Sequence, residues 1–227
     1  MRTALGKALH PQLLVVGLLL TSVQISIPLL LARTPQHPDV RPVQYPQHSD
    51  VQPVQYPRSR GPVSASVQVV EFSNFACPSC RAVQGDIKEL LDLYGDRLFY
   101  TFRHFPKFSD SQSVYAHIAA ECASEQSAFW PYYDKLFAEQ PVWHSRSAQK
   151  SIFTGYAKEL GLDLGRFEAC FQDDATFERI SKEIDQGEAM GVSHTPTFLI
   201  GDHLFVGPTQ FREKGIPFIK KLLEGGS

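Results

Sequence analysis

Two cysteines separated by two residues, Cys77 and Cys80, are the side chains in this chain best suited to chemistry. The sulfur atoms of such a pair can form a reversible disulfide, and a thiolate can attack a disulfide in another molecule. The preceding run, Ser66 to Phe72 (SVQVVEF), is rich in Val and Phe and is typical of a buried strand. Helical spacing follows from Ala82 to Tyr94, so the pair is predicted to lie where a strand turns into a helix.

This position predicts different roles for the two thiols. Cys77 lies at the expected N-terminus of the helix, where unpaired backbone N–H groups and the helix dipole favour an anion. Its thiol should therefore lose its proton more readily than that of a free cysteine. Pro78 is suited to the first helical turn, where no N–H is needed. Cys80 lies one turn further, should be more buried, and could resolve a mixed disulfide.

Half of a zinc site and an inert buried pair are the alternative interpretations of these cysteines. A structural zinc site needs four ligands. The other cysteines, Cys122 and Cys170, stand alone, and the chain contains neither a second CxxC nor an HxxxH pattern. Redox chemistry is therefore favoured, and no metal or cofactor is predicted.

A second motif lies far downstream, at Gly191 to Ile200 (GVSHTPTFLI). It ends in an apolar strand, Thr197 to Ile200, and Gly201-Asp202 then indicates the tight turn of a hairpin. Together with EFSNFACPSC at 71–80, this motif resembles the DsbA-like thioredoxin family, particularly its BdbD-like branch. The resemblance covers roughly residues 67–223, and two motifs in the right order make it specific.

The resemblance implies roles for three further residues. In this family the Thr-Pro bond is cis and faces the CxxC, so Thr195 and Pro196 are assigned that role. A proline at the mouth of a strand is physically plausible, although an ordinary trans proline there is the alternative. Glu71 is assigned a place beneath the CxxC, where it would assist proton transfer to or from Cys80. A strand-edge glutamate that faces water is the alternative, because carboxylates are rarely buried.

His194, two residues before the proline of the second motif, is a candidate tuning residue. A cation there could lower the pKa of Cys77 further. The dipeptide Pro78-Ser79 lacks the charged histidine of the strongest oxidants in the family, which puts a strongly oxidising potential in doubt. His104 and His117 are expected to be structural.

The N-terminal region predicts export. Arg2 and Lys7 precede Leu13 to Ala32, an uncharged run long enough to span a bilayer. Positive charges before this run place residues 1–12 in the cytoplasm and the rest on the extracytoplasmic side of a bacterial envelope. A cleaved signal peptide is the alternative, but Leu30-Leu31-Ala32 is a poor cleavage site. A membrane anchor at 13–32 is therefore favoured.

Residues 33–65 are predicted to be a disordered linker. An eleven-residue unit that begins at Gln36 (QHPDVRPVQYP) recurs at Gln47 (QHSDVQPVQYP). Prolines at this density oppose helix and sheet and favour extended polyproline II. A spacer is favoured over a ligand for a partner domain.

The rest of the chain predicts an α/β fold. A second strand at 97–105 closes a βαβ unit with the first. The expected architecture is a thioredoxin fold at 66–225 with an all-helical insertion at about 108–173, preceded by the hydrophobic anchor and the Pro-rich linker. Helices are expected at 111–124, 129–137, 148–160, 164–170 and 174–190, and a closing helix at 209–223 is interrupted by Gly215 and Pro217.

Cys122 and Cys170 both fall in the predicted insertion. An exported location permits a disulfide between them, and some relatives in the resembled family carry a second bridge in this region. Two buried free thiols are the alternative, because cysteine packs like a small hydrophobe. A second redox-active pair is the least favoured interpretation, because neither cysteine lies in a CxxC.

The function predicted from these features is an exported thiol:disulfide oxidoreductase that forms disulfides in secreted or envelope proteins. The net charge of −2 gives no electrostatic case for nucleic acid. The resemblance implies two partners for a monomeric enzyme: unfolded exported proteins with free cysteines, and a membrane quinone-linked reoxidase of the DsbB or vitamin-K-epoxide-reductase type. A reductase or isomerase on the same fold, and a non-enzymatic tethered peptide-binding module, are the alternatives.

Overall fold

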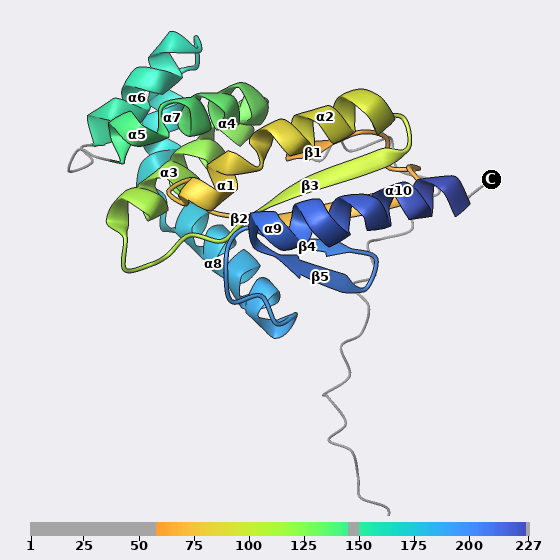
Figure 1. The fold of residues 1–227 in the computed structure, drawn as a ribbon. Coiled ribbons are helices and arrows are strands. Elements are labelled where there is room, and N and C mark those ends of the chain that lie inside the picture. The colour runs from red at the N-terminus through yellow and green to blue at the C-terminus, as the bar shows by residue number, and fades with distance from the viewer. Residues whose placement is uncertain (1–57, 145–149, 226–227) are drawn as a thin grey trace, which may run out of the picture. The chain divides into compact units, whose positions relative to one another are not determined.

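The computed structural model describes residues 58–144 and 150–225. A five-stranded sheet with the strand order β1-β3-β2-β4-β5 forms its centre (Figure 1). Strands β2 and β3 are parallel, whereas β1 pairs antiparallel with β3, and β4 pairs antiparallel with both β2 and β5. The strands are β1 Ser59–Arg60, β2 Val67–Ser73, β3 Leu98–His104, β4 Thr197–Ile200 and β5 His203–Val206. The predicted thioredoxin fold is confirmed.

The helices divide into connections within the fold and an insertion. Two short helices join β2 to β3, five helices follow β3, and a long helix returns the chain to the sheet (Figure 1). A last group packs along β4 and β5 and closes the domain. In chain order they are α1 Pro78–Ala82, α2 Gln84–Tyr94, α3 Ser111–Ser124, α4 Phe129–Ala138, α5 Gln140–Trp143, α6 Lys150–Glu159, α7 Leu164–Gln172, α8 Asp174–Ala189, α9 Gly207–Gln210, a π-helical turn Phe211–Gly215, and α10 Ile216–Gly225.

Strand β2 is buried on both faces except at Gln68, which explains why apolar residues occur at both odd and even positions along it. Val67 and Val69 belong to the main core, which extends into the helical insertion. Val70 and Phe72 face the opposite side and form a smaller cluster beneath α8. Gly187 lets α8 approach this side, since a Cβ there would lie only 3.0 Å from the Phe72 ring.

The insertion is joined internally by a disulfide between Cys122 on α3 and Cys170 on α7. The two Cα atoms are 5.6 Å apart, which is ordinary disulfide spacing. Three aspartates act as N-caps in this part of the chain and accept hydrogen bonds from the first backbone N–H groups of α3, α7 and α8. These caps are Asp110, Asp163 and Asp173.

The domain begins earlier in the chain than expected. The predicted linker 33–65 is wrong at its C-terminal end, because Ser59 and Arg60 form β1 and pair with Thr101 and Tyr100 of β3. The preceding Arg58 holds this short strand in place through ion pairs to buried carboxylates on α3 and α8. A strand of two residues is too short to show a hydrophobic period. The sequence around it is rich in proline and predicted a linker, so β1 was not expected.

Two helices also differ from expectation. The helix expected at 82–94 is divided at Val83, which separates α1 from α2. The closing helix is not interrupted at Gly215, since the π-helical turn there leads directly into α10. Pro217, the second residue of α10, follows directly on this π-helical turn, so the helix continues through a residue that has no N–H to donate.

The expected anchor at 13–32 and most of the linker lie outside the described residues. Within residues 58–144 and 150–225, no helix has the length and apolar character needed to cross a bilayer.

Candidate active site

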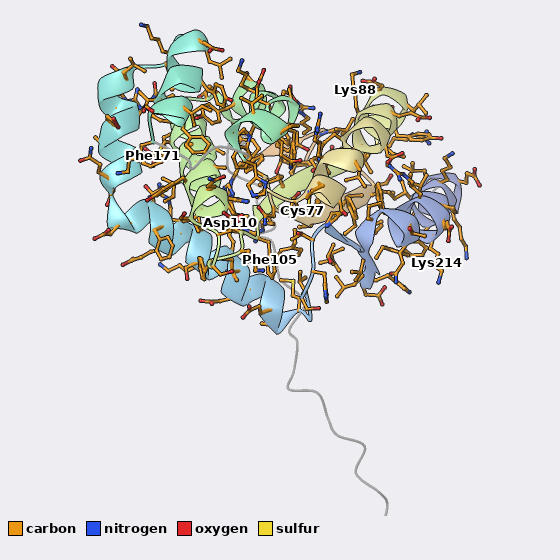
Figure 2. The ribbon with its side chains drawn as sticks, turned by 60° about the vertical axis from the view of Figure 1, so that its left-hand side comes forward. Cys77, Lys88, Phe105, Asp110, Phe171 and Lys214 are labelled. Carbon is orange, nitrogen blue, oxygen red and sulfur yellow. A yellow bond between two sulfur atoms is a disulfide. The ribbon has the colours of Figure 1, made fainter. Side chains whose placement is uncertain are left out.

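The two cysteines of the CxxC lie at the turn between β2 and α1. Cys77 is the N-cap residue of α1, and Pro78 occupies the first helical position. Cys77 is half-buried and Cys80 is fully buried, and both thiols are free. Figure 2 shows Cys77 at the start of α1, with the helical insertion on one side and the C-terminal helices on the other. One thiol is therefore accessible to another molecule and the other is held behind it.

The second motif meets this turn from the other end of the chain. The Thr195-Pro196 peptide bond is cis, and the Thr195 carbonyl oxygen lies 3.4 Å from the Cys77 sulfur. Pro196 is buried at the entrance to β4, and its carbonyl accepts a hydrogen bond of 2.8 Å from the Gly207 N–H. The fold thus brings Thr195 and Pro196 to the position opposite the CxxC.

The two thiols have opposite electrostatic environments. A hydrogen bond from the Cys80 thiol is the largest influence on the pKa of Cys77. Together with the Thr195 side chain and the backbone N–H groups of Cys80 and Ser79, it lowers this pKa to about 5, against the opposing effect of burial. Burial raises the pKa of Cys80 well above its usual value, and the neighbouring Cys77 adds to this effect. At neutral pH the pair therefore consists of a Cys77 thiolate and a Cys80 thiol.

Glu71 on β2 is completely buried, and its charge contributes to the raised pKa of Cys80, so the carboxyl lies near that thiol. The alternative of a strand-edge glutamate facing water is therefore wrong. Burial raises the pKa of Glu71 to about 7, and the charge of Cys77 adds to this rise, while the hydroxyls of Ser73 and Tyr100 partly offset it. A carboxyl group that titrates near neutral pH next to a buried thiol can exchange a proton with it.

Comparison with known proteins identifies the family. A sequence model described as thioredoxin matches residues 54–215. The thiol-disulfide exchange protein alpha-DsbA2 of Wolbachia pipientis has a similar structure, with 26% sequence identity, a TM-score of 0.60, and coverage of 76% of this chain and 88% of that one. The chain belongs to the DsbA-like thioredoxin family.

Other relatives agree in fold and differ in overall organisation. Oxidised BdbD from Bacillus subtilis is 23% identical, with a TM-score of 0.64, and the match covers 74% of this chain and 94% of BdbD. A Na(+)/H(+) antiporter NhaA of Herminiimonas arsenicoxydans is 35% identical over 141 residues, which are 62% of this chain and 22% of the antiporter. This DsbA-like chain spans about a fifth of the length of the curated relatives it matches.

His194, the candidate tuning residue of this DsbA-like site, lies on the exposed loop that precedes Thr195. Its side chain is exposed, and its Nδ1 lies 2.9 Å from the hydroxyl of Ser193. It is also absent from the groups that lower the pKa of Cys77 among the described residues. The Thr195 carbonyl oxygen of the same loop lies 3.4 Å from the Cys77 sulfur, and an influence of His194 on Cys77 stays a prediction.

The helical insertion holds the active-site turn through residues that the sequence did not single out as functional. The Gln140 side-chain amide on α5 donates to the carbonyls of Phe75 and Cys77, at 2.6 and 3.1 Å. The Asn74 Oδ1 accepts from the Ser113 hydroxyl on α3 at 2.8 Å. Buried polar groups make hydrogen bonds almost without exception, so these contacts define the conformation of the turn.

His117 on α3 makes a third contact with the turn. Its Nε2 accepts the Phe75 N–H at 3.2 Å, so the proton of a neutral His117 must lie on Nδ1. That Nδ1 lies 2.6 Å from Nδ1 of His104, which must therefore accept, and His104 then donates from Nε2 to Glu121 at 3.3 Å. A line of hydrogen bonds thus connects the active-site turn to a carboxylate on the same helix.

A cluster of charged groups terminates this line. Glu121 is paired with Arg58 at 3.5 Å and with Arg179 at 3.4 Å. Glu183 accepts the backbone N–H of His104 at 2.7 Å and is also paired with Arg58. The only sequence signal for this network was the spacing of Ser113, His117 and Glu121 by four residues along one helix face.

The buried histidines predict a pH-dependent stability. Burial lowers the pKa of both His104 and His117, so the unfolded chain binds protons first as the pH falls below about 6.5. The stability that these neutral rings contribute is therefore present above this pH and is lost as the pH falls toward their folded pKa values. We expect His117→Gln, which retains an acceptor for Phe75, to reduce this loss by up to about 1.4 kcal/mol per pH unit.

The measurement is the free energy of unfolding in urea between pH 8 and pH 5 for the wild type and His117→Gln. The difference between the two proteins is the informative quantity, because Glu71 and Cys77 also titrate in this range. His203→Gln, at an exposed position in the β4–β5 hairpin whose ring pairs with the exposed Asp202, serves as the control. Parallel pH profiles for the wild type and His117→Gln would contradict the prediction.

Proposed function

We propose that this chain is an exported thiol:disulfide oxidoreductase that forms disulfides in secreted or envelope proteins through Cys77 and Cys80. The asymmetry of the two thiols carries the proposal. Cys77 is accessible and has a pKa of about 5, whereas Cys80 is buried and has a raised pKa. Thiol–disulfide exchange by a cysteine pair needs an accessible sulfur that is a good leaving group. The second sulfur of the pair stays buried in the protein.

The proposed reaction transfers a disulfide from the chain to its substrate. A substrate thiolate attacks the Cys77 sulfur, the Cys77–Cys80 bond breaks, and Cys80 leaves as a thiolate that takes a proton from Glu71. The second thiolate of the substrate then attacks the substrate sulfur that is bonded to Cys77. This forms the substrate disulfide and releases Cys77 as a thiolate. The substrate loses two electrons, which the cysteine pair gains.

The direction of transfer follows from the stability of the Cys77 thiolate. A thiolate held by hydrogen bonds stabilises the reduced pair, and a stable reduced form makes the disulfide more oxidising. The likeness to a Wolbachia thiol-disulfide exchange protein supports exchange chemistry. We further propose that residues 13–32 place the domain outside the cytoplasm, and that a quinone-linked membrane protein reoxidises Cys77 and Cys80.

A redox titration against glutathione tests the direction. We expect a midpoint well above the thioredoxin value of about −270 mV, together with oxidation of a reduced, unfolded protein that contains cysteines. A midpoint near the thioredoxin value would favour the reductase alternative. Failure of the intact protein to exchange disulfides at all would favour a peptide-binding module.

Glu71→Gln is expected to slow the attack of Cys80 on a mixed disulfide formed at Cys77. The carboxylate accepts the Cys80 proton in that step, and a positioned base contributes roughly 10²-fold or more. In the wild type the rate should rise as the pH increases through about 7, where Glu71 ionises. The variant should lose this inflection.

The assay starts from a small-molecule mixed disulfide on Cys77 and follows release of the small thiol by absorbance across pH. Glu89→Gln, at an exposed position on the outside of α2, is the matched control and should behave as the wild type. An unchanged inflection in Glu71→Gln would assign the proton transfer to another group.

A further inference from the structure

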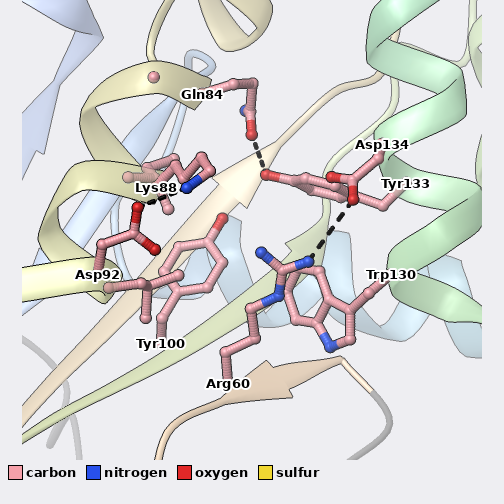
Figure 3. Close-up of a pocket in the computed structure, with 11 residues that line it drawn as sticks. Arg60, Gln84, Lys88, Asp92, Tyr100, Trp130, Tyr133 and Asp134 are labelled. Carbon is pink, nitrogen blue, oxygen red and sulfur yellow. Dashed lines mark hydrogen bonds and ion pairs between the residues drawn. The ribbon is translucent and has the colours of Figure 1, made fainter. Parts of the chain in front are cut away.

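A cavity of about 450 Å³ lies between β1, β3, α2 and α4 (Figure 3). It is on the side of the sheet that Glu71 faces, because Tyr100, which lines it, is hydrogen-bonded to Glu71. Its mouth is bordered by the exposed side chains of Lys88, Asp92 and Asp134, so water can enter. Arg60 of β1 forms one wall and lies 4.1 Å over the Trp130 ring. Strand β1, which was not predicted from the sequence, therefore forms part of the cavity wall.

The innermost wall of the cavity contains a tyrosine that contacts the catalytic carboxyl group. Tyr100 on β3 is buried and lines the cavity, and its hydroxyl donates to Oε2 of Glu71. Tyr100 and Tyr133 interact through their hydroxyls, and Tyr133 donates to the side-chain oxygen of Gln84. Figure 3 shows these tyrosines among the residues that surround the cavity. One hydroxyl thus separates Glu71 from a space open to water.

The proposed exchange reaction creates a need for such a connection. Cys80 and Glu71 are both 0% exposed, so a proton that passes between them has no direct contact with water. In the mixed disulfide a substrate is bonded to Cys77 and covers the accessible side of the turn. Glu71 must nevertheless exchange protons with water, because with a pKa of about 7 it is present in both forms, and only the carboxyl form can give a proton to Cys80 while only the carboxylate can take one.

We propose that Tyr100 relays protons between Glu71 and water in this cavity, behind the substrate-binding side. This inference rests on the proposed function. When Cys80 attacks a mixed disulfide, its proton passes to the Glu71 carboxylate. The Glu71 O–H then gives a proton to the Tyr100 oxygen as the Tyr100 O–H bond breaks and releases its own proton to a cavity water. Reprotonation follows the reverse path, and neither direction moves electrons.

The charges at the mouth fit a water path better than a site for a charged ligand. The two cations, Arg60 and Lys88, are paired with the two carboxylates, Asp134 and Asp92. The mouth is therefore close to neutral and retains strong hydrogen-bonding groups for water. Either carboxylate can also accept a proton that leaves through the cavity.

The kinetics of Glu71 protonation test the relay directly. The probe is the carbonyl stretch of the protonated carboxyl, followed by infrared spectroscopy after a rapid change from well above to well below pH 7. Glu71→Gln assigns the band, because it lacks the carboxyl. We expect Tyr100→Phe, which removes only the hydroxyl, to slow the appearance of the band by about tenfold or more.

A second variant closes the cavity without touching Glu71 or the cysteines. A Cβ at Gly85, which lines the cavity, meets no atom within 4 Å, so Gly85→Phe adds a large apolar side chain at the cavity wall without a clash and should also slow the band. Gly155 on α6 is equally open, and Gly155→Phe is the matched control that should leave the kinetics unchanged. Wild-type kinetics in either Tyr100→Phe or Gly85→Phe would overturn the proposal.

The infrared measurement does not depend on redox turnover. It uses the full chain in its reduced form, so it returns a result even if the protein fails to oxidise thiols. Loss of the proposed function and loss of the proposed relay are therefore separate outcomes.

Discussion

Cys80→Ser is expected to accumulate substrate proteins as mixed disulfides on Cys77, and Cys77→Ser is expected to abolish exchange. Cys77 is accessible and has a pKa of about 5, so nearly all of it is thiolate at pH 7, compared with a few per cent for a free cysteine. In Cys80→Ser the Cys77 thiolate attacks a disulfide of a substrate protein, whose other sulfur leaves as a thiolate, and the mixed disulfide persists because the chain has no second thiol at the site to release it. Non-reducing electrophoresis and mass spectrometry of the trapped species measure the outcome.

The pH dependence of alkylation provides an independent check on the nucleophile. In the reduced wild type, the rate of Cys77 alkylation should fall as the pH decreases through about 5. In Cys77→Ser the remaining Cys80 should react slowly, because it is buried and its pKa is raised. Equal trapping of substrate by Cys77→Ser and Cys80→Ser would show that the assignment of the nucleophile is wrong.

Removal of the Cys122–Cys170 disulfide is expected to have the largest effect on stability. The bridge joins residues separated by 48 positions, and the loop-entropy relation gives about 4 kcal/mol for a loop of this size. We expect the double variant Cys122→Ala and Cys170→Ala to lose about 2–4 kcal/mol in urea unfolding. Exchange chemistry should be largely retained, because neither residue contacts the active-site turn.

The control uses a background in which Cys77 and Cys80 are both replaced by serine. In that background a reductant acts only on the second disulfide, and it should lower the stability of the intact bridge to the level of the double variant. Thiol labelling of denatured, non-reduced wild type must leave Cys122 and Cys170 unmodified. Labelling of both would show that the bridge is not formed.

Much of the fold could be predicted from local patterns. The helix at 111–124 has the bounds that the sequence indicated, and the hairpin around Gly201-Asp202 joins β4 to β5. The placement of Cys77 at a helix N-terminus also followed from a strand pattern and a helix pattern on either side of it. These features depend on contacts among neighbouring residues, which hydrophobic periodicity and turn chemistry report directly.

The positions of Glu71 and Pro196 came from family resemblance, because no periodicity reveals what a buried polar residue contacts. The same limit applies to His194, whose distance along the chain from Pro196 says nothing about the direction of its side chain. A side chain on the next loop residue can face either the sulfur or water, and packing of the loop decides which.

The sequence by itself determined where the redox pair lies, which strand and helix flank it, and that one thiol precedes the other at a helix start. Only the tertiary structure decided how the turn is held, because His117 and Gln140 reach it from helices 42 and 65 residues away from Phe75. It alone also placed Tyr100 between Glu71 and a water-accessible cavity. Hydrogen bonds between buried polar groups depend on distances that arise only when remote elements pack, so no local pattern encodes them.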